Sequence, residues 1–145
     1  MNIAQLLRRS ALVHGDRPAV LAGARLLHDY RQLAARVAAL AGHLRTRCGV
    51  QPGERVAIFS ANCPEYLEAL HAIHWAGAVS VPVNYKLHAR ELAYVLEDSG
   101  ARVVCVSGAL QDDALAAGAD AAALQVLGGP AWQQAAAQGA PLALE

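Results

Sequence analysis

The centre of the chain alternates short apolar runs with segments of helical periodicity. Three apolar runs, residues 56–59, 79–83 and 103–106, are long enough for strands and too short for helices. Continuous apolar runs are typical of parallel strands that are buried on both faces. Because helical segments separate the runs, the pattern predicts an α/β fold with three layers, a parallel sheet with helices on both faces. These three strands should lie adjacent or nearly adjacent at its centre.

The N-terminal part predicts two helices joined by a small hairpin. Residues 2–14 carry apolar side chains at helical spacing, and residues 19–21 and 25–28 are short apolar runs on either side of a glycine. Asp29 and Gln32 follow with the spacing of a capping box, in which each side chain accepts a hydrogen bond from the other residue's backbone N–H. A second helix is therefore expected to begin there.

Two further helices connect the predicted strands. Asn62 is expected to cap the first of them, with Pro64 in its first turn and Glu65 at the acidic position of a capping box. The second covers residues 88–99 and ends at Gly100.

The pattern weakens towards the C-terminus. Residues 109–123 are rich in alanine and predict one helix, residues 124–127 predict an outer strand, and residues 132–138 predict a last helix. We expect a single domain over residues 1–145, of which 109–145 is the least specific part.

The composition excludes some classes of function. Twelve basic and twelve acidic residues give a net charge of zero, which is not the basic surface of a nucleic-acid-binding protein. No apolar run approaches the length of a membrane span. The mean hydropathy of +0.25 predicts exposed apolar surface, and hence self-association or a partner that covers it.

The three cysteines, Cys48, Cys63 and Cys105, are odd in number and have no C-x-x-C spacing. Free thiols in a reducing cytoplasm are the ordinary interpretation. A catalytic cysteine is the alternative, but no motif surrounds any of the three.

One helix carries a second candidate site. Glu68, His71 and His74 recur every third residue and could be metal ligands, although partly buried helix histidines are the commoner explanation. Glu65 and Glu68 are expected to be a solvated acidic first turn that the helix dipole favours, and not an acid/base pair. No metal site and no catalytic residue is assigned.

Five patches in the same order resemble the AMP-forming acyl- and aryl-CoA ligases of the adenylate-forming superfamily. They are residues 27–33, 53–59, 62–66, 75–82 and 84–101. Each patch alone is explained by cap, core or turn chemistry, whereas five in register are specific. The resemblance covers residues 1–108 closely and 109–138 in pattern only.

Two positions refine the resemblance. His88 stands where relatives usually place a Thr or Ser cap, which bears on the start of that helix. The sequence Asn84-Tyr85-Lys86 after Pro82 favours acid–CoA ligases, because peptide-synthetase adenylation modules typically carry an Asp-Pro pair there.

The resemblance implies a ligase of fatty acid metabolism that uses ATP, Mg²⁺ and CoA and acts on a small-molecule carboxylic acid. It also implies that the phosphate-binding loop and the catalytic lysine belong to later segments, and neither occurs in this sequence. The 145-residue chain is therefore expected to be inactive alone and to bind none of these cofactors tightly.

The resemblance gives one position a binding role. Lys86 matches a basic residue that in some relatives contacts a phosphate of the CoA nucleotide, and lysine suits phosphate as a point charge. The alternative is a solvated loop lysine. Tyr85 beside it is expected to line the same channel or to cover the edge of the sheet.

Two functions of different kinds remain open. The chain is either the N-terminal portion of a cytoplasmic acid–CoA ligase or a stand-alone, non-catalytic α/β binding or interaction module. A peptide-synthetase adenylation fragment is a third alternative.

Overall fold

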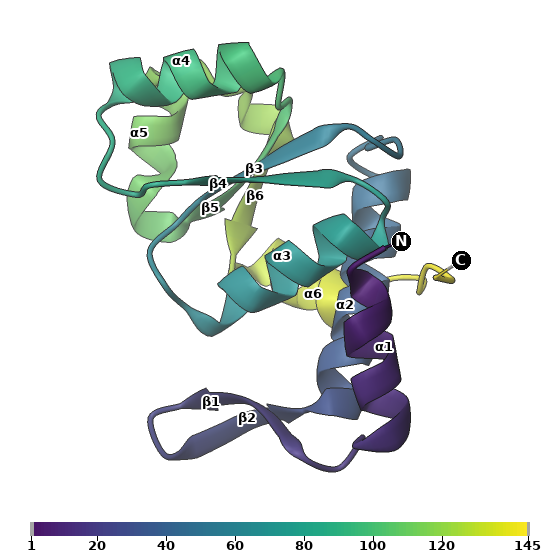
Figure 1. Ribbon diagram of the computed structural model, residues 1–145. Coiled ribbons are helices and arrows are strands. Elements are labelled where there is room, and N and C mark those ends of the chain that lie inside the picture. The colour runs from purple at the N-terminus through teal and green to yellow at the C-terminus, as the bar shows by residue number, and fades with distance from the viewer. Residues whose placement is uncertain (1, 145) are drawn as a thin grey trace.

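The computed structural model describes residues 2–144 and consists of a parallel sheet between two helical layers, with a hairpin set apart from the sheet (Figure 1). In chain order the elements are α1 (Ala4–Val13), β1 (Pro18–Ala22), β2 (Arg25–Asp29), α2 (Tyr30–Thr46), β3 (Arg55–Phe59), α3 (Pro64–Trp75), β4 (Val79–Val83), α4 (Ala89–Ser99), β5 (Val103–Ser107), the 3-10 turn η1 (Gly108–Leu110), α5 (Gln111–Ala116), the 3-10 turn η2 (Ala121–Ala123), β6 (Leu124–Leu127) and α6 (Pro130–Gln138). The predicted α/β class is confirmed.

The sheet has the order β4-β3-β5-β6, and all its strands are parallel. The three strands predicted to be central are neighbours, since Ile58 lies opposite Pro82 on one side and Cys105 on the other. The predicted outer strand is also present as β6. The hairpin β1–β2 is antiparallel, as predicted.

The prediction that β4 is buried on both faces is wrong. Val79 is 49% exposed and Pro82 is exposed, because β4 forms the edge of the four-stranded sheet and has a neighbour on one side only. Proline lacks a backbone N–H and is found within sheets at edge strands, so its position agrees with this topology.

Side chains of β3 and β5 alternate between two hydrophobic cores, one on each face of the sheet. The α1–α2–α3–α6 face includes the following buried residues: Leu7, Leu33, Val37, Leu40, Leu44, Val56, Ile58, Ile73, Val103, Cys105 and Trp132. The α4–α5 face is smaller and is built from Ala57, Phe59, Val83, Leu92, Ala101, Val104, Val106 and Ala114.

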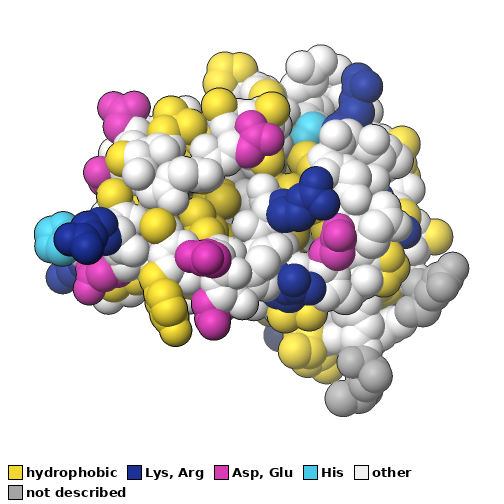
Figure 2. Space-filling view, turned by 90° about the horizontal axis from the view of Figure 1, so that it is seen from above, with side chains coloured by type: hydrophobic (Ala, Val, Ile, Leu, Met, Phe, Trp, Pro, Cys, Tyr) yellow, Lys and Arg dark blue, Asp and Glu magenta, His cyan; other side chains and the backbone are white. Residues whose placement is uncertain are grey.

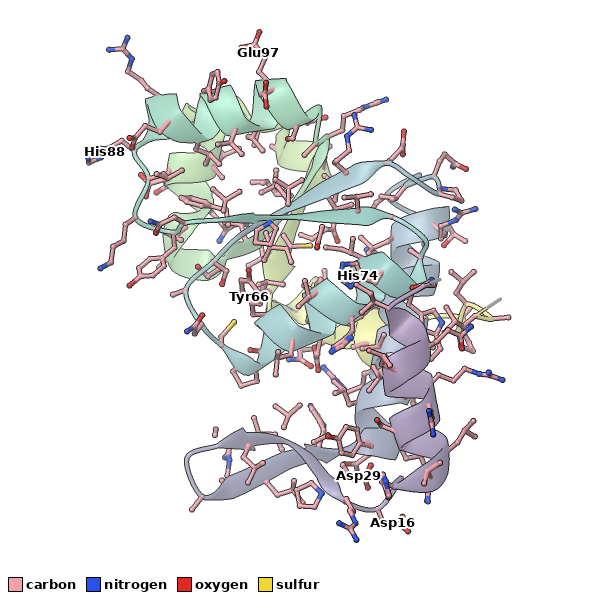
Figure 3. All side chains as sticks on the ribbon, in the orientation of Figure 1. Asp16, Asp29, Tyr66, His74, His88 and Glu97 are labelled. Carbon is pink, nitrogen blue, oxygen red and sulfur yellow. The ribbon has the colours of Figure 1, made fainter. Side chains whose placement is uncertain are left out.

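The capping box at the start of α2 is confirmed. Asp29 Oδ1 accepts a hydrogen bond from the backbone N–H of Gln32 at 2.7 Å, and Gln32 Oε1 accepts one from the N–H of Asp29 at 3.0 Å. Asp29 lies where the hairpin joins α2 (Figure 3). The cap thus fixes the hairpin at the far end of this helix from the sheet.

The start of α3 differs from the expected cap, whereas α4 begins where predicted, with His88 as its N-cap. Asn62 does not cap α3; because Pro64 is the first helical residue, the N-cap falls at Cys63, which makes no side-chain capping bond. At α4, Glu91 Oε2 accepts a hydrogen bond from the backbone N–H of His88 at 2.9 Å. This half of the capping box does not depend on the residue type at position 88.

The single helix predicted over residues 109–123 is wrong. The segment divides into η1, α5 and η2, because Gly118 adopts φ +89° after the end of α5. This left-handed conformation ends a helix and is accessible mainly to glycine. The helix predicted near the C-terminus is present as α6.

The segment after α6 lies across α2. The backbone N–H of Leu142 donates to the carbonyl of Ala38, and Trp75 Nε1 donates to the carbonyl of Leu142, both at 2.9 Å. Gly42 permits this approach, because a Cβ at that position would lie 2.0 Å from the carbonyl oxygen of Ala140. Residues 139–142 therefore complete the cover over the α2 side of the core.

Candidate functional site

The turn that follows β4 presents the residues to which the sequence assigns a binding role. Asn84 Oδ1 accepts a hydrogen bond from the backbone N–H of Lys86 at 3.0 Å, and the N–H of Leu87 donates to the carbonyl of Asn84. These bonds hold Tyr85 and Lys86 in one defined turn. Both side chains are exposed, and Lys86 Nζ lies 5.7 Å from the centroid of the Tyr85 ring, within the range of a cation–π contact.

The location of this turn is that of a ligand site in α/β proteins. It lies at the carboxyl edge of the sheet, where open parallel sheets bind their ligands. Lys86 is the only lysine in the sequence, and it forms no salt bridge with any residue of the described part of the chain. Its ammonium group is therefore available to an anionic partner.

Glu68 is buried, so the prediction of a solvated Glu65/Glu68 pair is wrong for this residue. Its side chain is 2% exposed and accepts hydrogen bonds from Arg36 Nε at 2.5 Å and from Trp132 Nε1 at 2.8 Å. His28 Nε2 lies 3.4 Å from the same carboxylate. Helical spacing explains the burial, since Glu68 lies one turn before the buried Ala72.

This carboxylate joins four elements, of which α3 and α6 are distant in sequence from β2 and α2. His28 belongs to β2, Arg36 to α2, Glu68 to α3 and Trp132 to α6, and Arg36 Nη2 also donates to Gln133 Oε1 at 2.9 Å. A buried charge is tolerated when it is paired and hydrogen-bonded, as here. The Glu68 cluster, as we call these five side chains, therefore orients the hairpin and α6 against the central helices.

His71 and His74 form no metal centre with Glu68, whose carboxylate is engaged in its own cluster. No group of three or more His, Cys, Asp or Glu side chains within residues 2–144 could hold a metal ion. His74, near the C-terminal end of α3, has Nε2 3.0 Å from Ser80 Oγ (Figure 3). Burial lowers the pKa of both histidines, and His74 lowers that of His71 further.

The cysteines do not form a reactive cluster. None of Cys48, Cys63 and Cys105 is in a disulfide. Burial raises the pKa of Cys105 to about 12, and burial also raises that of Cys48. Since the thiolate is the nucleophile, Cys105 is a core residue of low reactivity.

Sequence analysis missed two arrangements of charge. Arg36 was not linked to Glu68, although the position of Glu68 on the apolar side of its helix was a usable signal. Arg55 and Arg102 each directly precede an apolar run in the sequence, and only the pairing of β3 with β5 places them at the same edge.

The comparisons with known proteins agree with this fold. The family model described as AMP-binding enzyme matches residues 7–140. A feruloyl-CoA synthase of Amycolatopsis sp is 52% identical over 75 residues, which are 52% of this chain and 15% of that protein. The chain thus spans less than a fifth of this curated relative.

Solved structures of CoA ligases superpose on nearly the whole chain. A benzoate CoA ligase from Burkholderia xenovorans gives a TM-score of 0.85 at 28% identity, covering 99% of this chain and 30% of that one. A protein described as a long-chain-fatty-acid CoA ligase, from Rhodopseudomonas palustris, gives a TM-score of 0.84 at 32% identity, covering 99% of this chain and 38% of that one. With a family model matched over most of its length, the chain belongs to the AMP-binding enzyme family.

Proposed function

We propose that the chain is the N-terminal portion of an ATP-dependent acid–CoA ligase that acts in the cytoplasm. The overall reaction converts a carboxylate, ATP and CoA into acyl-CoA, AMP and pyrophosphate. The observation that carries the proposal is the family match over residues 7–140, together with similarity to proteins named as CoA synthases and ligases.

The described residues do not fit ATP and Mg²⁺. They contain no group of metal-ligating side chains and no loop rich in Ser, Thr and Gly that ends in a lysine. We therefore assign the binding of ATP and Mg²⁺ to segments of the enzyme other than this chain, and we expect the chain alone to form no acyl-adenylate.

The contribution of this chain to the site is a contact to CoA. Lys86 would bind a phosphate of the CoA nucleotide, because its turn is fixed by Asn84 and its ammonium group has no competing acidic partner within residues 2–144. Tyr85 would line the same channel and orient the lysine through the cation–π contact.

The test has two parts. The purified 145-residue chain should release no pyrophosphate when supplied with ATP, Mg²⁺ and aromatic or fatty acids, and carboxylate-dependent release would contradict the proposal.

In a longer reading frame that carries the missing loop, Lys86→Gln should raise the KM for CoA about tenfold, the size of one charge-assisted hydrogen bond. Adenylate formation should be unchanged.

The matched control for Lys86 is Arg90→Gln, which removes an exposed cation from α4 four residues further along the chain. It should leave the KM for CoA unchanged. An equal rise in both variants would mean that the lysine contributes only general positive charge.

A stand-alone binding module is the second candidate. It is favoured by the closure of the α2 side of the core by residues 139–142 within the same chain. A native reading frame that lacks a phosphate-binding loop and a later catalytic lysine would support it. The Asn84-Tyr85-Lys86 sequence disfavours the third candidate, a peptide-synthetase adenylation fragment.

We further propose that the 145-residue chain self-associates. Four large apolar side chains on α1 and the residue before it are more than half exposed: Ile3, Leu6, Leu12 and Val13. A specific contact would bury on the order of 1,000 Å². Light scattering at tens of micromolar should report a dimer or larger species, and a monodisperse monomer would contradict this.

A further inference from the structure

A hollow of about 800 Å³ lies on the α4–α5 face of the molecule. It is lined by α4, by the chain from the end of α5 to η2, by the first residues of β5 and by the turn after α2. Figure 2 looks onto this side, with hydrophobic side chains deep between the elements and charged side chains around them. Its size is within the range of small-molecule sites.

The pairing of β3 with β5 places two arginines side by side in this hollow. Val56 is the partner of Val103, so Arg55, the first residue of β3, and Arg102, the residue directly before β5, lie at the same edge of neighbouring strands. Partners in adjacent strands point to the same face. Both arginines line the hollow, and Arg47 joins them from the end of α2.

Arg55 is held in place by the backbone. Its Nε donates to the carbonyl of Ser99 at 2.5 Å. Gly100 leaves room for the guanidinium group, because a Cβ at that position would lie 2.6 Å from Arg55 Nη2. The remaining donors of this guanidinium are thereby presented beside those of Arg102.

None of the three arginines forms a salt bridge with any residue from 2 to 144. Like charges on neighbouring strands are unfavourable, and an anion between them would relieve the repulsion. The acids of the same hollow compete little for the arginines, since Glu54 accepts from the N–H of Gln51 and Asp120 from the N–H of Ala122. Glu97 is the exception, since its carboxylate accepts no hydrogen bond from residues 2–144.

The floor beside the arginines is apolar. Ala101 and Val104 belong to the α4–α5 core and are buried, and Leu96 from α4 adds a half-buried side chain that packs against it. An inorganic anion would leave this surface without a partner. A ligand that pairs with the arginines and also covers the apolar floor carries one carboxylate and a compact apolar body.

We propose that this hollow is a binding site for a small organic carboxylate, with Arg55 and Arg102 holding the carboxylate and the apolar floor of Ala101, Val104 and Leu96 holding the apolar body. The site lies at the amino edge of the sheet, whereas Lys86 lies at the carboxyl edge. It is thus separate from the proposed CoA contact and does not depend on the proposed function.

The experiment is a titration of the ¹⁵N-labelled 145-residue protein with benzoate, followed by amide chemical shifts. Shifts should concentrate on residues that line the hollow, and benzamide, the neutral analogue of the same shape, should bind at least about tenfold more weakly. Arg102→Gln should weaken benzoate binding about tenfold. Glu97→Gln should strengthen it about twofold, because an unpaired like charge is removed from the rim.

Arg8→Gln, an exposed arginine on α1, is the matched control and should leave benzoate binding unchanged. The proposal is overturned if the shifts lie outside the hollow, if benzamide binds as tightly as benzoate, or if Arg102→Gln binds benzoate like the unmodified chain. Thermal melting of each variant establishes that the fold is retained, since all three substituted side chains are exposed.

Discussion

The two faces of the parallel sheet are built differently. The α1–α2–α3–α6 face has the larger core, and the buried acid on it, Glu68, is fully paired. The α4–α5 face has a smaller core, and its arginines at the sheet edge have no salt bridge with the described residues.

Because of this difference, the charge on the first face serves the stability of the fold, whereas the charges on the second face are available for ligand binding. A buried and satisfied charge fixes how elements pack, but it offers nothing to a ligand. An exposed and unpaired cation contributes little to folding and remains available for binding. We therefore expect substitutions on the first face to act on unfolding and substitutions in the hollow to act on ligand affinity.

The largest effect is expected from Ile58→Asp. Ile58 is fully buried in β3, so the substitution places an unpaired charge in the larger core. The cost of about 5 kcal/mol or more is comparable to the stability of a whole domain. Circular dichroism and urea unfolding should show a chain that does not fold cooperatively.

Val79→Asp is the control for that substitution, because Val79 is also a strand residue but is 49% exposed at the sheet edge. It should melt cooperatively. A soluble Ile58→Asp chain with the same unfolding free energy as Val79→Asp would mean that β3 is not central.

Glu68→Gln should cost about 3 kcal/mol, because it leaves the guanidinium of Arg36 partly buried without its counter-charge. Urea unfolding followed by tryptophan emission measures the loss, since Trp132 donates to Glu68. Asp98→Asn, an exposed acid on α4, should change the unfolding free energy by less than about 0.5 kcal/mol. If Glu68→Gln and Asp98→Asn changed the free energy of unfolding equally, the proposed difference in stability between the two faces would be contradicted.

Gly42→Ala tests the closeness of residues 139–142 to α2. The added Cβ would meet the carbonyl of Ala140, and overpacking outweighs the gain in helix propensity, for a net cost of about 1–2 kcal/mol. In a Trp132→Phe background, the emission of Trp75 should change because its bond to Leu142 is strained. Ala35→Gly, at an exposed site of α2, should cost about 1 kcal/mol without altering that emission.

The smallest effect concerns pH. The pKa of His71 is lowered in the folded chain, so below the ordinary value of about 6.5 the unfolded chain binds more protons. The contribution of His71 to the free energy of unfolding is therefore complete above about pH 6.5, and it is lost as the pH falls towards the lowered pKa of the folded chain. His71→Gln should therefore lose less stability between pH 7 and pH 5 than the unmodified chain in urea titrations. An unaltered pH dependence in His71→Gln would contradict the assignment.

Most of the fold could be predicted from patterns among residues that are close in sequence. The apolar runs predicted β3, β5 and β6, and the Asp29–Gln32 spacing predicted the start of α2, because both depend on neighbours in sequence. The edge position of β4 could not be inferred, since an apolar run looks the same at an edge and at a centre. The alanine content of residues 109–123 predicted one helix, but the left-handed conformation of Gly118 ends the helix within this segment.

The sites were less accessible to sequence analysis because they join distant residues. Glu68 meets Arg36 and Trp132 across separations of 32 and 64 residues. Arg55 and Arg102 become neighbours only through strand register. Lys86 was identified by resemblance, and its proposed contact stays a prediction.

The proline in β4 also bears on how copies of the chain behave at high concentration. A foreign strand that extended the sheet at this edge would find no N–H at Pro82, so a continuous hydrogen-bonded ladder could not form along β4. Growth of the sheet from molecule to molecule, the route to cross-β fibres, is therefore hindered at this edge. Any aggregates that begin at β4 should be amorphous and fail to bind thioflavin T.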